Sequence, residues 1–301
     1  MRVGVIGTGN MGENHVRTYL LLHEHCQLVG IYDNDEKKRR QISKKYKVKE
    51  FQSIHDLLQC VDAVSITVPT EFHYDVGLIC IKHGVHMLME KPITSTVAQA
   101  KDLNKKAIEA GIKLQVGHIE LFNPLIKALA RELANRDIIG IDFHRLSPYN
   151  ERIKNVDVVK DLMIHDIYIL QNLLKDKLLE FYTLGKVIEN TPKHAVVIME
   201  SPQGAIAQLT ASFKSKRKIR TIQILTEDAL FETDILKNEI KITKDTELQT
   251  IKLNNDIKPL NNQLLDFINC IRYKREPLIS GKDGIKALVI TNEISEILNK
   301  E

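Results

Sequence analysis

Apolar positions in the first 117 residues follow two alternating rhythms. Short β-branched runs such as Val3-Gly4-Val5-Ile6 are separated by longer stretches with apolar residues at helical spacing. Strands that alternate with helices in this way are typical of a parallel sheet with crossover helices. The pattern predicts strands at residues 2–6, 27–32, 48–51, 62–67, 86–89 and 113–116. It predicts helices between them at residues 11–23, 35–45, 72–83 and 96–110.

The pattern changes after about Gly117. Helices are predicted at 124–134 and 158–175, on either side of a strand at 141–146. Runs with a period of two then follow one another without long helices, which is typical of an antiparallel sheet. These strands are predicted at residues 180–187, 195–200, 205–213, 218–225 and 230–233, before two closing helices at 260–273 and 283–298. We therefore expect an α/β fold: a doubly wound parallel sheet, then an α+β domain with an open antiparallel sheet.

Length and composition narrow the class of protein. The 301 residues are about twice the usual size of one domain, and 43% of them are hydrophobic, enough for a sizeable core. A net charge of +4 is too small for a protein that mainly neutralises a phosphate backbone, so we expect no nucleic-acid partner. No run approaches the roughly 18 uncharged apolar residues of a membrane span. The early strand leaves no room for a signal peptide, so we expect a cytoplasmic protein without a membrane partner.

The four cysteines, Cys26, Cys60, Cys80 and Cys270, form no Cys-x-x-Cys pair and lie in apolar surroundings. Such residues are typical of buried, reduced thiols. We therefore expect no metal site.

A glycine-rich loop directly follows the first predicted strand and opens the first helix. In the spacing Gly-x-Gly-x-x-Gly, the first glycine permits a tight turn, the second lets the backbone approach a pyrophosphate, and the third lets helix and strand pack closely. Asp33 follows the second strand, 21 positions after Gly12, where a carboxylate binds a ribose diol. The loop therefore predicts dinucleotide binding. Its expected cofactor-binding residues are Gly7, Thr8, Gly9, Asn10, Met11, Gly12 and Asp33.

The choice between the two nicotinamide cofactors depends on the same carboxylate. Asp33 would repel the 2′-phosphate of NADP, so the sequence favours NAD. The basic run Lys37-Lys38-Arg39-Arg40 keeps NADP open as an alternative. We interpret this run as the solvated face of a helix.

Polar residues follow the later strands of the predicted sheet. Open α/β sheets bind ligands beyond the carboxyl ends of their strands. Lys91 follows a buried strand and precedes Pro92, which gives the lysine a defined position and makes it a candidate active-site residue; the alternative is a surface lysine at a turn. We expect the Lys91–Pro92 peptide bond to be cis. The candidates for the cofactor at these strand ends are Pro69, Thr70, His73, Glu90 and Lys91 itself, and His118 is a candidate for the substrate.

A carboxylate and an imidazole share one face of a predicted helix in the second half of the chain. Asp161 and His165 are four residues apart. A carboxylate beside an imidazole holds its tautomer and raises its basicity, which suits proton transfer at neutral pH. Taken alone, such a pair is more often a surface hydrogen bond. Its combination with Lys91 favours a catalytic role.

Several of these motifs occur together in a known family. The glycine loop with His15, Val68-Pro69-Thr70 with His73-Tyr74, Glu90-Lys91-Pro92-Ile93, and Asp161 with His165-Asp166 resemble the glucose-fructose oxidoreductase/inositol dehydrogenase/MocA family. The resemblance covers essentially the whole chain and extends to the segment 276–284 before the last helix.

The resemblance implies an NAD(P)-binding Rossmann domain at 1–119 and a substrate-binding and oligomerisation domain at 120–301. It implies oxidation of a sugar or cyclitol through NAD(P), and a homodimer or homotetramer formed through the open sheet. Segments 119–124 and 145–148 look most similar to members acting on UDP-activated amino sugars, which suggests oxidation at the 3-position. A dehydrogenase or reductase of free inositol, a free sugar or an imine, and a non-catalytic NAD-binding sensor, are the alternatives.

The resemblance also assigns site residues. The catalytic group would be Lys91, Asp161 and His165, with His165 as general base, Asp161 orienting it and Lys91 near the reacting oxygen. The sequence leaves open which of Lys91 and His165 takes the proton. Arg145, Arg152 and Lys154 are candidates for a diphosphate, with a solvated loop as the alternative. The expected substrate-binding residues are Lys91, His118, Asn123, Arg145, Arg152, Asp161 and His165.

Overall fold

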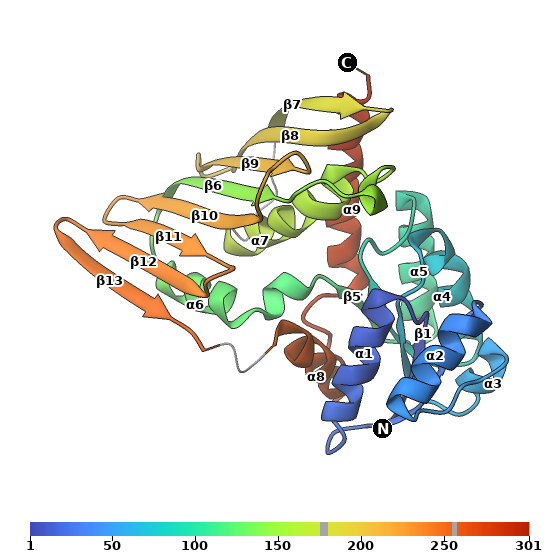
Figure 1. The fold of residues 1–301 in the computed structure, drawn as a ribbon. Helices are drawn as coiled ribbons and strands as arrows, with labels where there is room; N and C mark the ends of the chain where they lie inside the picture. The colour runs from blue at the N-terminus through green and yellow to red at the C-terminus, as the bar shows by residue number, and fades with distance from the viewer. Residues whose placement is uncertain (175–179, 255–257, 301) are drawn as a thin grey trace. The chain divides into compact units, whose positions relative to one another are not determined.

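The computed structural model describes residues 1–174, 180–254 and 258–300, and the chain divides into two compact units (Figure 1). The first unit comprises Met1–Ile119 and Lys258–Leu288; the described residues between 120 and 254 and from Val289 onward form the second. The predicted division assigned residues 258–288 to the second domain. They belong to the first unit because Leu264 and Phe267 are buried in the same core as Val3 and Val5.

The first unit contains a five-stranded parallel sheet in the order β2-β1-β3-β4-β5. Its strands are β1 Arg2–Ile6, β2 Gln27–Tyr32, β3 Ala63–Ile66, β4 His86–Glu90 and β5 Leu114–Gly117. The doubly wound parallel sheet is thus confirmed, but the predicted strand at 48–51 is wrong. That segment forms one isolated bridge, between Glu50 and Ile31. Val48 and Phe51 are buried, so their apolar character reflects packing and not a strand of the sheet.

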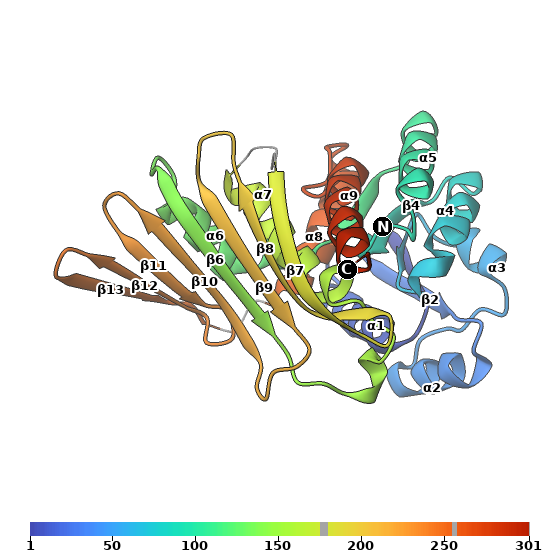
Figure 2. The same cartoon turned by 90° about the horizontal axis from the view of Figure 1, so that it is seen from above.

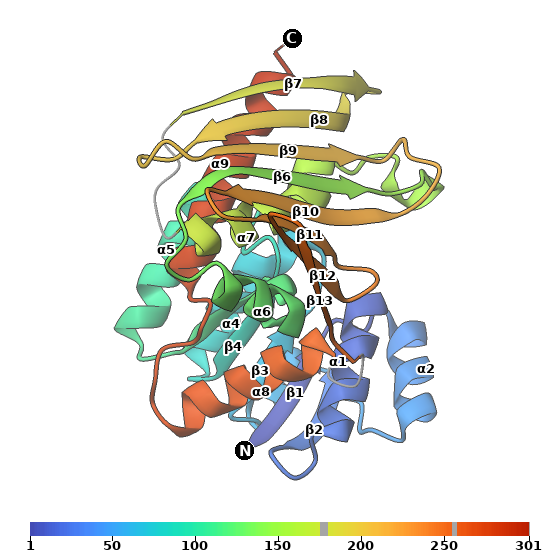
Figure 3. The same ribbon diagram turned by 90° about the vertical axis from the view of Figure 1, so that its left-hand side faces the viewer.

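Helices cover both faces of this sheet. They are α1 Asn10–Leu21, α2 Glu36–Tyr46, α3 Ile54–Leu58, α4 His73–Lys82, α5 Val97–Glu109 and α8 Pro259–Arg272. α1 and α8 lie side by side (Figures 1 and 3) and bury Tyr19 and Phe267 in one core cluster. On the other face, the glycines of β1 and α4 leave room for large side chains: Leu57 of α3 packs on Gly4, and Leu103 of α5 packs on Gly77.

The second unit contains an eight-stranded sheet in the order β13-β12-β11-β10-β6-β9-β8-β7. Its strands are β6 Ile138–Leu146, β7 Glu180–Ile188, β8 Thr191–Glu200, β9 Ile206–Ser212, β10 Ile219–Thr226, β11 Leu230–Asp234, β12 Glu239–Lys244 and β13 Glu247–Lys252. Neighbouring strands are antiparallel except β6 and β9, which are parallel. The sequence analysis missed β12 and β13; nearly all of β13 is exposed, so it carries no buried alternation.

The helical segments of the second unit include α6 Pro124–Glu132, a π-helical turn Val159–Met163 and α7 Ile164–Leu174. α6 and α7 lie on one face of the sheet (Figure 2), against inward side chains such as Phe143 and Phe231. The last helix, α9 Gly281–Leu298, ends in this unit, where Leu298 packs on Gly185 of β7. Among the residues with described placement, no helix is both long and apolar enough to cross a membrane.

Candidate active site

The glycine loop between β1 and α1 has the geometry that its spacing predicts. Gly7 has a φ of +92°, and a Cβ there would lie 2.7 Å from the backbone of Thr67 and Val68. A Cβ on Gly12 would collide with the carbonyl oxygen of Gly7. Gly9 faces open space and caps α1 without a side-chain hydrogen bond. The first amides of α1 are therefore accessible to a pyrophosphate, and the loop fits a dinucleotide.

Asp33 lies directly after β2 and contacts the same loop. Its Oδ2 accepts hydrogen bonds from the Thr8 backbone N–H (2.5 Å) and the Thr8 hydroxyl (2.8 Å). Its Oδ1 accepts a third bond, from the backbone of Asp35 at 2.8 Å. The side chain is only partly buried. These bonds hold the carboxylate beside the glycine loop, and its contact with a ribose diol stays a prediction.

The basic run after Asp33 is not uniformly solvated. Lys37, Lys38 and Arg40 are exposed, but Arg39 is buried. The Arg39 guanidinium donates to the Asp33 carbonyl at 2.7 Å and to Gln52 at 2.6 Å, and it pairs with Glu50. These contacts use the guanidinium of Arg39 inside the protein, where it stabilises the end of β2.

The ends of β3 and β4 are tied together by a buried histidine. His73 begins α4, and its two ring nitrogens lie 2.9 Å from the carbonyl oxygens of Val68 and Pro92. Burial lowers the pKa of His73, although the two carbonyl oxygens act in the opposite direction. The Lys91–Pro92 bond is cis, as predicted. Pro69 and Thr70 lie in the connection that His73 braces, and their contact with a cofactor stays a prediction, as does that of His73 itself.

Glu90 ends β4 and is also buried. Its Oε1 lies 3.2 Å from Nε2 of His15, a fully buried residue of α1, and its Oε2 accepts from the Lys91 backbone N–H at 3.4 Å. The missing side chain of Gly117 leaves room for this carboxylate. The sequence analysis gave His15 no role; its position three residues after Gly12, on the inward face of α1, was the available signal.

Lys91 and His118 follow neighbouring strands, β4 and β5. Lys91 is partly buried, whereas His118 is 1% exposed. Burial, reinforced by the positive charge of Lys91, lowers the pKa of His118 to about 3. His118 is therefore a neutral imidazole near a lysine, at the carboxyl edge of the parallel sheet, where the sequence placed a substrate contact.

Asp161 and His165 lie at the amino end of one helical segment in the second unit. Asp161 lies in the π-helical turn and His165 is the second residue of α7, so the predicted continuous α-helix begins with a wider turn. Between Val158 and Leu170, only Lys160, Asp161 and His165 are not buried. Asp161 and His165 are thus accessible positions on an otherwise buried segment.

Arg145 of β6 was predicted to contact substrate, but it is 3% exposed and bound by two carboxylates. Its Nε lies 2.8 and 2.9 Å from the two oxygens of Asp166, and Nη1 lies 2.9 Å from Glu120. Burial opposes the charge, but the two carboxylates outweigh it and raise the pKa of Arg145. The guanidinium therefore joins β6 to α7, and we leave it out of the proposed substrate contacts.

The remaining predicted substrate contacts differ in position. Asn123 is buried, and its Oδ1 caps α6 by accepting from the Leu125 backbone at 3.0 Å. Lys154 is exposed and pairs with Glu189 at 3.7 Å. The side chain of Arg152 lies outside the described part of the structure. A substrate contact for Asn123 and Arg152 stays a prediction.

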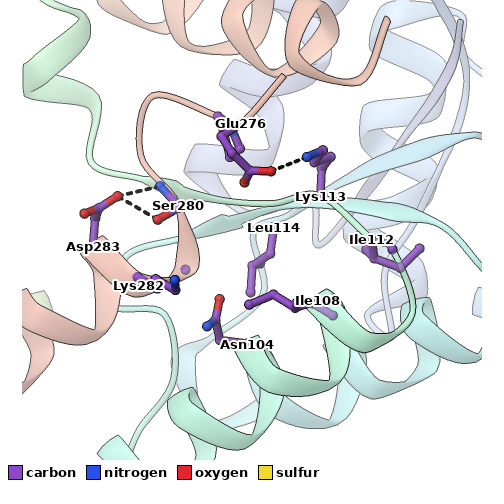
Figure 4. Close-up of a pocket in the computed structure, with 13 residues that line it drawn as sticks. Asn104, Ile108, Ile112, Lys113, Leu114, Glu276, Ser280, Lys282 and Asp283 are labelled. Carbon is purple, nitrogen blue, oxygen red and sulfur yellow. Dashed lines mark hydrogen bonds and ion pairs between the residues drawn. The ribbon is translucent and has the colours of Figure 1, made fainter. Parts of the chain in front are cut away.

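A separate pocket of about 500 Å³ lies at the amino end of β5, in the first unit (Figure 4). Lys113, paired with Glu276, and Leu114 form one wall. Ser280 donates from its backbone and its hydroxyl to Asp283, which caps the start of α9. Because ligands of open α/β sheets bind beyond the carboxyl ends, this pocket is not part of the candidate active site.

The glycine loop, the Asp33 carboxylate beside it and the polar strand ends define the first unit as a dinucleotide-binding Rossmann unit. Residues 1–118 match a family model described as the oxidoreductase family with an NAD-binding Rossmann fold, GFO_IDH_MocA. Relatives that match almost the whole chain point the same way, so the protein resembles the NAD-dependent oxidoreductases of that family.

The chain is similar to the UDP-N-acetylglucosamine 3-dehydrogenase of Acidithiobacillus ferrooxidans, with 28% identity over 98% of this chain and 96% of the relative. A solved structure of that enzyme superposes with a TM-score of 0.94 and covers 100% of this chain and 98% of that chain. The myo-inositol 2-dehydrogenase of Thermotoga maritima is 23% identical over 96% of this chain and 94% of the relative.

Proposed function

We propose that the protein oxidises a secondary alcohol of a UDP-activated amino sugar, at the 3-position, with NAD as hydride acceptor. The observation that carries this proposal is the similarity, along nearly the whole chain, to the UDP-N-acetylglucosamine 3-dehydrogenase, with a TM-score of 0.94. Inositol dehydrogenases match at lower identity, so oxidation of a free cyclitol is the second candidate.

The glycine loop would hold the cofactor, with Gly9 and the start of α1 at its pyrophosphate and Asp33 at its ribose. When bound, its nicotinamide accepts the hydride that leaves the sugar carbon. NADP stays the alternative, but the contacts of Arg39 remove one cation from the candidates for a 2′-phosphate.

The chain must supply a base for the hydroxyl proton and a donor for the oxygen. His165 takes the proton, and Asp161 holds the imidazole in the required tautomer. Lys91, placed after β4, donates to the reacting oxygen and lowers the cost of its developing negative charge. His118 has a pKa of about 3, so its ring is uncharged at neutral pH and adds no second positive charge beside Lys91. It acts as a neutral hydrogen-bonding group toward the substrate.

A second copy of the chain is the partner we propose for the outer face of the eight-stranded sheet. Within the second unit, no described helix lies on that face. The strand register aligns Ile206 of β9, Leu225 of β10, Leu230 of β11 and Leu248 of β13 in one row across the sheet. Tyr182 and Leu184 of β7 are 76% and 71% exposed on the same face. An extended apolar face of this kind is typical of an interface.

Substrate oxidation is tested by following NADH formation with UDP-N-acetylglucosamine, free N-acetylglucosamine, myo-inositol and free hexoses. We expect NAD+ reduction with the UDP-sugar and little with the free sugars. Turnover of inositol alone would favour the second candidate. A chain that binds NADH and oxidises none of these compounds would instead be a nucleotide-binding sensor.

A further inference from the structure

Lys193 occupies a core position of β8. The inward residues of this strand alternate as Lys193, Ala195, Val197 and Met199, and each is at most 2% exposed. The strand pattern therefore places a lysine where an apolar side chain is expected. Burying an ammonium group costs free energy unless its N–H donors are bonded. This residue therefore needs a specific explanation.

The Lys193 ammonium is bonded to three backbone carbonyls. Nζ donates to the carbonyl oxygens of Ile153 at 2.8 Å, Lys154 at 2.7 Å and Val156 at 2.8 Å. An ammonium has three N–H donors, so these bonds satisfy all of them. The Phe213 ring lies beside it, with its centroid 6.0 Å from Nζ. The ammonium group thus binds three carbonyl oxygens of one short segment, residues 153–156.

This segment leads directly into the π-helical turn that carries Asp161. Asp157 follows Val156, and its Oδ1 accepts from the Val159 backbone N–H at 2.8 Å. The Asp157 carbonyl accepts from the Asp161 backbone N–H at 3.0 Å. The contacts run from Lys193 to Val156, and through Asp157 to the backbone of Asp161. A displaced segment would therefore displace Asp161, and His165 after it.

We propose that Lys193 is a positioning residue, which holds the 153–156 segment so that Asp161 and His165 keep their catalytic geometry. This inference rests on the proposed function of those two residues. An apolar residue would fill the core equally well but would remove a donor from three carbonyls, of which that of Ile153 keeps the Val156 backbone N–H at 3.1 Å. A lysine at this position is explained by the need to order the segment, since packing alone does not require it.

Amide hydrogen–deuterium exchange tests the positioning without relying on activity. In Lys193→Ala, we expect faster exchange over residues 153–163 than in the wild type. The removed atoms correspond to propylammonium, which should enter the vacated space, donate to the same carbonyls and slow the exchange again. Tetramethylammonium carries the same charge but no N–H, and should restore nothing. Lys186→Ala, which removes an exposed lysine from the adjacent strand, is the matched control.

Turnover is then measured on the same proteins at a temperature where each is folded. Misplacement of a catalytic group by about 1 Å can cost on the order of 100-fold, so we expect kcat in Lys193→Ala to fall by about 10-fold to 100-fold. Propylammonium should recover part of it, and NADH affinity should stay unchanged. If Lys193→Ala does not fold, Lys193→Met keeps the apolar stem and is measured in the same way.

Unchanged exchange over 153–163 would overturn the proposal. So would faster exchange together with wild-type kcat per folded molecule, because Lys193 would then have only a structural role. Failure of the proposed function looks different: the wild type itself would turn over none of the sugars. In that case the exchange measurement alone decides whether Lys193 orders the segment.

Discussion

At the scale of single residues, two histidines lie at the carboxyl edge of the parallel sheet. His73 and His118 are buried, and burial lowers the pKa of both. The two residues serve different purposes. His73 braces two strand ends through backbone carbonyls, whereas His118 stands near Lys91.

His118 predicts a pH dependence of stability. Below pH 6.5 the unfolded chain protonates this histidine, but the folded protein does not do so until about pH 3. Protonation of the unfolded state alone destabilises the fold, so the free energy of unfolding should fall as the pH decreases through this window. One such group contributes up to about 1.4 kcal/mol per pH unit.

Urea unfolding at pH 7, 6 and 5 measures this effect. We expect a shallower decrease for His118→Asn than for the wild type, and no change in slope for His23→Asn, which alters an exposed histidine. Equal slopes for wild type and His118→Asn would contradict the assignment.

Lys91→Ala and His165→Ala should each lower kcat by on the order of 100-fold, because each removes an acid–base or oxyanion-stabilising group. Steady-state NADH formation with the UDP-sugar measures this. The matched controls are Lys101→Ala and His23→Ala, which change exposed residues of the first unit. Near-normal turnover of both catalytic variants would refute the mechanism.

At the scale of elements, a buried ion cluster joins β6, α7 and the segment before α6. Arg145 is bound by Asp166 and Glu120, which lie 21 residues after it and 25 before it in the chain. Neither the strand pattern nor the helix pattern indicates this pairing, because β6 and α7 acquire their contact only when the unit folds. The cluster sits one residue from His165, and so fixes the start of the helix that carries it.

Arg145→Met should destabilise the protein by about 3–5 kcal/mol, because it leaves the buried Asp166 charge unpaired. Chemical denaturation measures the loss. Adding Asp166→Leu should recover part of it, since the unpaired charge is then removed. Arg40→Met breaks an exposed pair with Glu36 and should change stability by no more than about 1 kcal/mol. A cost for Arg145→Met as small as that of Arg40→Met would show that the cluster is not stabilising.

At the scale of the whole molecule, the outer sheet face is the surface through which we propose that two copies of the chain assemble. Tyr182→Asp with Leu184→Asp places two charges on this apolar face, where a partner copy would have to desolvate them. We expect sedimentation velocity to show a dimer or tetramer for the wild type and a monomer for the double variant.

Leu21→Asp controls for the substitution, because Leu21 is 63% exposed on α1 of the first unit and should leave the assembly intact. A wild-type monomer at micromolar concentration would remove the proposed interface. An unchanged oligomer in the double variant would place the contact elsewhere.

The sequence by itself determined the features that local patterns encode. The glycine loop and the aspartate after β2 could be predicted because their spacing is local in the sequence. The polar strand ends could be predicted because parallel strands bring their carboxyl ends to one edge of the sheet. The strand at 48–51 was predicted wrongly, since buried apolar residues look alike in a strand and in a packed loop. β13 was missed because nearly all of it is exposed, whereas β12 does carry the alternating buried residues Ile240 and Ile242 and was overlooked.

Only the tertiary structure decided which groups are paired in the interior. It assigned Arg145 to two carboxylates, Lys193 to carbonyls about 40 residues away, and α8 to the first unit. Periodicity reports which face of an element is buried, but it does not report what that face meets. Such partners are chosen by long-range packing and by the need to satisfy each buried charge, and both arise only in the folded chain.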